Sequence, residues 1–174
     1  KADIYAGMVY ERMGGAFGGR EYYEVERDAV RLARAVGRPV KVQWDRRDEF
    51  VASRSRPASA HRLRIALDER SDLSDWWYGY ISGHVAFARE RLANWLLPVV
   101  RLSEDLGVVK GAIAPYTAVH QRVEYSDVDL PIDLGVWRSL NAAPSIFAIE
   151  SAMDELAVQK GLDPVDFKIA QMKG

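Results

Sequence analysis

Residues 13–20 read Met-Gly-Gly-Ala-Phe-Gly-Gly-Arg and join a stretch of strand character to a helical pattern. Before them, residues 1–10 favour a strand. After them, apolar residues recur at helical spacing over residues 21–36, with acids early and arginines late, and Gly37 with Pro39 ends the helix. A glycine turn before a helix lets backbone N–H groups approach an anion or a cofactor, whereas a purely structural turn needs only glycines with positive φ.

The glycine loop (residues 14–19) does not match the common nucleotide-binding motifs. Gly14 and Gly19 have the spacing of a Walker A loop, but Arg20 stands at the lysine position and Glu21 at the position of the Mg²⁺-binding hydroxyl. The glycines also depart from the Gly-x-Gly-x-x-Gly fingerprint of dinucleotide-binding folds. Four glycines around one aromatic residue, followed by Arg-Glu, form a denser pattern than a tight turn requires.

Four further segments favour strands because they alternate apolar and polar residues or are rich in aromatic and β-branched ones. They are residues 39–44, 61–67, 75–82 and 119–130. A polar turn at residues 68–72 separates the second from the third. Strands that follow one another without an intervening helix argue against a regular doubly wound sheet.

Helical patterns return in the second half of the chain. A short helix is expected over residues 86–96, and residues 131–141 form a loop. After Pro144, an amphipathic helix runs to Lys160 and Gly161, and Asp163-Pro164 opens the last helix. The apolar face of the amphipathic helix comprises Ile146, Ile149, Met153, Leu156 and Ala157, and its solvated face comprises Glu150, Asp154 and Glu155. The chain is therefore expected to be an α+β domain over residues 1–174, a layered mixed sheet with helices.

The composition is that of a globular chain. The 174 residues are 48% apolar and 28% charged with a net charge of -1, which argues against a nucleic-acid surface or a polybasic membrane anchor. No apolar run approaches the roughly 18 residues of a membrane-spanning helix. The absence of cysteine excludes disulfides and iron–sulfur ligation by this chain, and three dispersed histidines offer no metal site.

The glycine loop and several later blocks together resemble one known protein family. The blocks are residues 12–21, 33–44, 47–50, 135–139, 147–151, 153–157 and 161–167. In this order they look like the molybdopterin-binding large subunit of the xanthine dehydrogenase and aldehyde oxidase family of molybdenum hydroxylases, within its isoquinoline oxidoreductase or nicotinate dehydrogenase branch. Each block alone is a weak signal, whereas their joint occurrence over nearly the whole chain is a strong one.

The resemblance implies a cofactor and partners. In that family a pterin-ligated molybdenum hydroxylates a carbon of an aldehyde or N-heterocycle with water, and electrons pass to iron–sulfur clusters on another subunit or domain. We therefore expect a molybdopterin-type cofactor shared with other segments or chains, and a small-molecule substrate. The expected protein partners are the remaining molybdopterin-binding polypeptide and a subunit that carries iron–sulfur clusters. The expected compartment is either the bacterial cytoplasm or the periplasm.

The same resemblance assigns roles to individual residues. The expected cofactor-binding residues are Gly15, Ala16, Phe17, Gly18, Gly19 and Arg138. Phe17 and Gly18 would bring backbone toward the molybdenum, and Arg138 would lie near the pterin, where a guanidinium fork suits phosphate. Glu21 would stand beside the substrate as the catalytic residue, sharing a proton with it. The alternatives are an acid in the first helical turn for Glu21 and a surface arginine for Arg138.

Three expectations follow from these assignments. The apex of the glycine loop should lie close to the Trp137-Arg138 loop, since both would serve one cofactor. The family's later catalytic glutamate lies in a region that this chain lacks, so the alternative to an enzyme part is a non-catalytic scaffold or assembly subunit derived from the family. The apolar residues Phe87 and Trp95 to Leu97 are expected to be buried against a missing partner.

Overall fold

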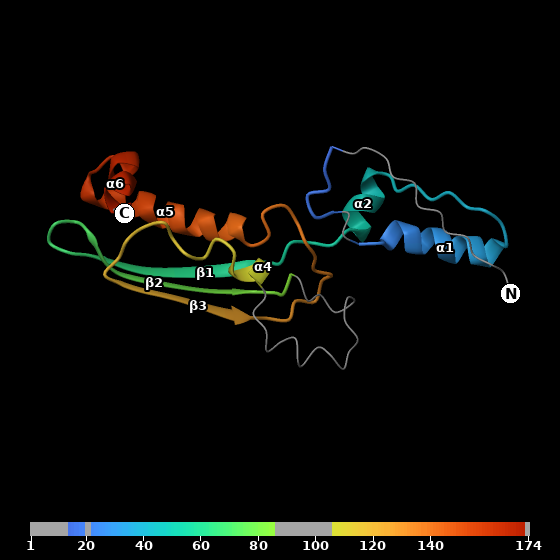
Figure 1. Cartoon of the computed structure of the whole chain (residues 1–174), viewed down its shortest axis with the longest axis horizontal. Coiled ribbons are helices and arrows are strands. Elements are labelled where there is room, and N and C mark those ends of the chain that lie inside the picture. Colours follow the sequence, from blue (N-terminus) through green and yellow to red (C-terminus); the bar gives the residue numbers. More distant parts are fainter. Residues whose placement is uncertain (1–13, 20–21, 86–105, 173–174) are drawn as a thin grey trace.

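The computed structural model describes residues 14–19, 22–85 and 106–172, and within them a mixed three-stranded sheet is packed against a long helix (Figure 1). Strand β1 (Ser59–Leu67) pairs antiparallel with β2 (Leu73–Ser82), and β2 pairs parallel with β3 (His120–Asp127). Helix α5 (Ala142–Lys160) lies along one face of the sheet. This arrangement confirms the predicted α+β class.

Strands β1 and β2 form a hairpin whose turn was expected from its polar residues. The Asp68 carboxylate accepts hydrogen bonds from the backbone N–H groups of Arg70 and Asp72, both at 2.9 Å. Ser71 adopts a positive φ of 67° in this turn. An aspartate that binds the backbone a few residues ahead is a common way to fix a turn.

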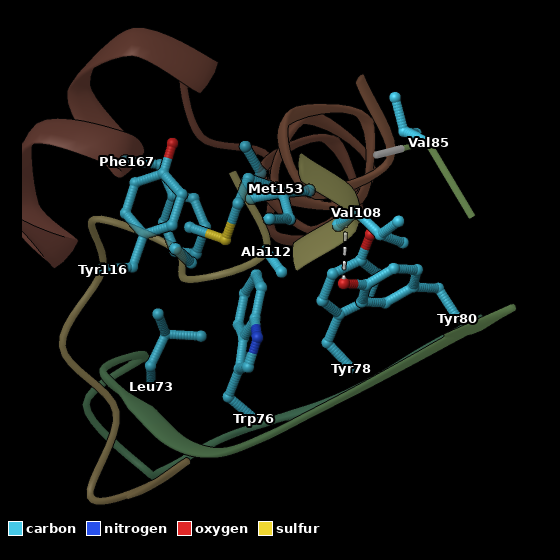
Figure 2. Close-up of a cluster of buried hydrophobic side chains, with 13 residues drawn as sticks. Leu73, Trp76, Tyr78, Tyr80, Val85, Val108, Ala112, Tyr116, Met153 and Phe167 are labelled. Atoms are coloured by element: carbon cyan, nitrogen blue, oxygen red, sulfur yellow. Dashed lines mark hydrogen bonds between the residues drawn. The ribbon is translucent and has the colours of Figure 1, made fainter. Parts of the chain in front are cut away.

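The hydrophobic core lies between the sheet and the helices of the second half (Figure 2). Trp76, Tyr78 and Tyr80 alternate along β2, so their side chains fall on the same face. Burial of each such side chain contributes about 1.5–3 kcal/mol. The helical residues that meet them are Ile149, Met153 and Ala157 of α5 and Phe167 of α6 (Pro164–Gln171).

The buried face of α5 differs by one position from the prediction. Ile149, Met153 and Ala157 are buried as expected, but Ile146 is 50% exposed and Ser145 takes its place in the interior. The buried residues Ala142, Ser145 and Ile149 lie three and four positions apart, as expected for one face of a helix. Their spacing therefore decides their burial more than their polarity does.

The acids of α5 follow the predicted solvated face at two of three positions. Asp154 and Glu155 are exposed as predicted, whereas Glu150 is half-buried and accepts a hydrogen bond from the Tyr116 hydroxyl at 2.7 Å. Lys168 of α6 bridges Glu150 at 3.0 Å and Asp154 at 2.6 Å. Two of the three acids therefore join α5 to α6 and to the loop before β3.

Helices α1 (Glu24–Val36) and α2 (Arg46–Ala52) lie together beyond one end of the sheet (Figure 1). Gly37 ends α1 in the left-handed conformation, as predicted. Helix α2 was not predicted from the sequence, although a capping box between Asp45 and Asp48 fixes its start. The short helix α4 (Leu106–Val109) was not predicted either.

The start of α1 differs from the prediction. Helix α1 begins at Glu24 instead of Glu21, and the Tyr22 hydroxyl just before it accepts a hydrogen bond from the distant Val136 N–H group. Its first-turn acids are Glu24 and Glu26, whereas Glu21 lies outside the described residues. Among the described residues, 39–44 pair with no other strand, and Val40, Val42 and Trp44 are more buried than the residues between them. The alternation therefore marks an extended chain with one packed side.

Several predictions lie outside the described residues. These are the strand over residues 1–10, the helix over residues 86–96 and the burial of Phe87, Trp95, Leu96 and Leu97. Among the helices that the structure does describe, none combines the length and apolar character needed to cross a membrane.

Candidate functional site

The glycine loop turns back on itself in a strained conformation. The Gly19 N–H group donates to the Ala16 carbonyl at 2.8 Å, and the two residues between them, Phe17 and Gly18, have φ values of 49° and 92°. Positive φ at both central positions is the pattern of a type I′ turn. Phe17 adopts this conformation at a cost of about 1–2 kcal/mol relative to glycine. Its side chain is 62% exposed, so its own burial does not account for the strain.

A second strained turn follows β3, in the arginine loop (residues 135–141). The Leu140 N–H group donates to the Trp137 carbonyl at 2.8 Å, and Ser139 and Leu140 have φ values of 68° and 51°. The two loops thus contain three of the four non-glycine residues with positive φ in the described ranges. Such strain gathers at functional sites more often than elsewhere.

The two loops are in contact. A Cβ atom added to Gly18 would lie 2.4 Å from the Val136 carbonyl oxygen and 2.9 Å from the Trp137 nitrogen, so only a glycine fits. The Arg138 guanidinium lies over the Phe17 ring, 5.2 Å from its centroid. This contact confirms the expectation that the apex of the glycine loop meets the Trp137-Arg138 loop.

A set of three side chains holds the arginine loop against the start of α1. Arg54 donates from Nε to Glu24 at 3.0 Å and from a terminal nitrogen to the Leu134 carbonyl at 3.3 Å. Its guanidinium lies 4.4 Å from the centroid of the Tyr22 ring, and the Tyr22 hydroxyl accepts the Val136 N–H group at 2.8 Å. We call Tyr22, Glu24 and Arg54 the clamp.

Backbone pairing strengthens the same junction. The Ser55 N–H group donates to the Asp133 carbonyl at 2.9 Å, and the Gly135 N–H group donates to the Ser55 carbonyl at 3.0 Å. Arg56 also donates to the Arg138 carbonyl. The segment before β1 therefore runs beside the arginine loop and fixes it from a second side.

The structure brings together most of the residues predicted for the site. Gly15, Ala16, Phe17, Gly18 and Gly19 form the strained turn, and Arg138 lies across from Phe17. Glu21 lies outside the described residues. The clamp and Arg56 were not predicted from the sequence. Their contacts join segments about 30 to 114 positions apart, and no local pattern indicates such contacts.

Comparison with known proteins identifies relatives of this chain. Residues 7–91 match the family model of the molybdopterin cofactor-binding domain. A subunit of nicotinate dehydrogenase from Pseudomonas putida is 32% identical over 167 residues, which cover 95% of this chain and 14% of that protein. The chain belongs to the molybdopterin-binding xanthine dehydrogenase family.

Other relatives support this membership. The aldehyde oxidoreductase molybdenum-binding subunit PaoC of Escherichia coli is 30% identical over 167 residues, which cover 93% of this chain and 20% of PaoC. The aldehyde oxidoreductase of Desulfovibrio gigas shares the fold, with a TM-score of 0.70 and 22% identity over 93% of this chain and 17% of that one. This member of the xanthine dehydrogenase family thus spans one fifth or less of the length of these relatives.

Proposed function

We propose that the glycine loop and the arginine loop form part of a molybdopterin site in an oxidoreductase. That enzyme would hydroxylate a carbon of an aldehyde or N-heterocycle with water as the oxygen source. The observation that carries the proposal is the contact of the two loops, with Gly18 against the Val136 backbone and Arg138 over Phe17. The relatives support it, since their names are those of dehydrogenases and oxidoreductases.

The residues present suit such a cofactor. Among the described residues, no atom would lie within 4 Å of a Cβ added at Gly14, which leaves this side of the loop open within the described structure. Arg138 is exposed and places a planar cationic fork beside the loop, which matches the phosphate of a pterin. The site thus has glycine backbone on one side and a guanidinium on the other, an arrangement that suits an anionic, planar cofactor.

Each residue would have its own task. The backbone of Phe17 and Gly18 would face the metal centre, and Arg138 would bind and orient the anionic part of the cofactor. Glu21 would accept or return a proton at the substrate's ring nitrogen or carbonyl group. The cofactor, when bound, supplies the two-electron oxidation that hydroxylation requires.

The proposal includes partners. We propose that the remaining molybdopterin-binding polypeptide encloses the site made by the two loops, and that the electrons pass to iron–sulfur clusters on a partner chain. Two relatives are themselves named as subunits, one of nicotinate dehydrogenase and the other of isoquinoline 1-oxidoreductase from Brevundimonas diminuta.

A second candidate is a non-catalytic scaffold derived from this family. The observation that favours it is the contact of the two loops, which joins segments far apart in the sequence and would serve assembly without a cofactor. Such a chain would keep the loop contact for assembly and bind no cofactor.

One purification separates the two candidates. The native assembly that contains this chain would be isolated from its source, and its molybdenum, its pterin and its co-purifying chains would be determined. The enzyme proposal expects stoichiometric molybdenum and pterin together with an iron–sulfur protein. A well-folded assembly without either component would leave the scaffold as the function.

A further inference from the structure

The backbone of Val136 is held from two sides by segments far away in the sequence. Its N–H group donates to the Tyr22 hydroxyl at 2.8 Å. Its carbonyl lies so close to Gly18 that no Cβ fits between them. The position of Val136 therefore fixes the distance between the glycine loop and Arg138, two residues further along the chain.

Tyr22 is in turn fixed by its neighbours. The Arg54 guanidinium stacks on its ring at 4.4 Å. Gly135 is buried against both, because an added Cβ would lie 2.6 Å from the Arg54 Cβ and 2.8 Å from the Tyr22 ring and hydroxyl. The phenol is thus confined between a guanidinium and a backbone segment, and its hydroxyl can meet only a narrow range of positions.

Arg54 is anchored at both ends of its guanidinium. The side chains of Arg54 and Glu24 are 8% and 18% exposed, and Nε of Arg54 donates to the Glu24 carboxylate at 3.0 Å. Its other contact, the Leu134 carbonyl at 3.3 Å, belongs to the residue before Gly135. Only a planar fork can reach a carboxylate and a carbonyl and stack on a ring at once, which a lysine cannot do.

We propose that Tyr22 and Arg54 are positioning residues that set the spacing between the Phe17-Gly18 turn and Arg138. The inference rests on the proposed function, because the spacing matters for a cofactor held by both loops. Neither residue belongs to the buried cluster between the sheet and α5, so loss of the clamp should leave that core folded. The clamp acts through the Val136 peptide and touches no reacting group itself.

The first test is Tyr22→Phe in the complete native assembly. This change removes one oxygen atom and keeps the ring that stacks on Arg54. Amide hydrogen exchange at Val136 should become about tenfold faster, the factor that a single hydrogen bond carries. The molybdenum and pterin content should fall severalfold. Tyr116→Phe is the matched control, because it also removes a bonded hydroxyl, here from a residue in the core.

The second test is Arg54→Lys, with Arg64→Lys as its control. Arg64 also stacks on an aromatic ring, that of Trp77 at 5.2 Å, but it lies on the sheet away from both loops. We expect Arg54→Lys to speed exchange at Val136 and to lower the cofactor content, and Arg64→Lys to change neither. The thermal unfolding midpoint of each variant shows whether the core is intact.

The outcomes are distinct. If the two clamp variants exchange the Val136 amide at the parent rate, the clamp does not hold the loop and the inference is wrong. Faster exchange with parent cofactor content would show that the spacing does not serve the cofactor, which also overturns it. A parent assembly that contains no molybdenum or pterin would instead overturn the proposed function, while exchange at Val136 would still report on the clamp.

Discussion

The core between the sheet and α5 and the pair of loops beyond its end are held together by different means. In the core, large side chains from β2 and α5 bury one another, with Trp76, Tyr78 and Met153 at 2% exposure or less. Helices α1 and α2, next to the loops, have no buried residue in the described structure. The loops depend instead on a half-buried ion pair, on hydrogen bonds to backbone and on glycines that allow close approach.

This difference predicts two kinds of sensitivity. A packed core loses stability in proportion to the volume removed, whereas a junction of single hydrogen bonds and close backbone contacts responds to the loss or gain of one atom. Substitutions in the core should therefore lower the free energy of unfolding. Substitutions in the loops should instead lower the amount of cofactor that the site binds.

The largest effect on stability is expected from Met153→Ala. Met153 is fully buried at the centre of the interface between α5 and the sheet. Truncation should lower the free energy of unfolding by about 2–5 kcal/mol through lost burial and a residual cavity. Denaturant unfolding measures this change, and amide exchange at Val136 should keep its parent rate below the transition. A parallel loss of protection at Val136 would mean that the core and the loops unfold as one unit.

The next effect is on turnover, from Glu21→Gln. This change keeps the shape of the side chain and removes its charge. If Glu21 shares a proton with the substrate, kcat/KM of the complete enzyme should fall by at least about a hundredfold, the low end of a general acid–base contribution. Molybdenum content should stay at the parent value. Activity within a few fold of the parent at equal molybdenum content would assign the function to the backbone of Phe17 and Gly18 instead.

A smaller effect on the stability of the fold is expected from pH, through side chains of the sheet. Burial lowers the pKa of His61, so its contribution to stability is present above its unfolded pKa of 6.5 and is lost as the pH falls below that value. Burial also raises the pKa of Tyr80 to about 12, so its contribution is present below pH 10 and is lost as the pH rises from 10 toward 12.

Unfolding midpoints measured from about pH 5 to 11 would check this prediction. Stability should decline at both ends of the range, and Tyr80→Phe should make the alkaline decline shallower. Exchange at Val136, corrected for the intrinsic pH dependence of amide exchange, should stay constant. A Tyr80→Phe variant with an unchanged alkaline slope would contradict the assignment of that slope to the buried phenol.

Much of the core could be predicted from the sequence, because helix and strand spacing are local. The positions of Ile149, Met153 and Ala157 on α5 follow from their spacing alone, and Asp163-Pro164 correctly placed the start of α6. Ile146 was assigned to the buried face on its polarity, whereas Ser145 lies on the buried line. Residues 39–44 were assigned to a strand because apolar and polar residues alternate along them. Such alternation indicates an extended chain with two different sides, but it does not predict which strand pairs with it.

The candidate site was predictable only in part. The position of the glycine loop before a helix follows from the sequence, and its approach to Arg138 was inferred from the family resemblance. The clamp was not predictable, because Tyr22 and Val136 are 114 positions apart and neither has a local signature. An arginine in a polar loop such as Arg54 is usually solvated, and only the three-dimensional structure reveals it as a nearly buried anchor.

The most direct test of the account compares Gly18→Ala with Gly37→Ala in the complete assembly. Both glycines have positive φ, 92° and 64°, but only at Gly18 would the added Cβ meet another described segment, 2.4 Å from the Val136 carbonyl oxygen. If the contact of the two loops holds the cofactor, Gly18→Ala should lower molybdenum and pterin content by about tenfold or more, and Gly37→Ala should leave it unchanged. A Gly18→Ala assembly with the parent amount of cofactor would contradict the claim that these loops form its site.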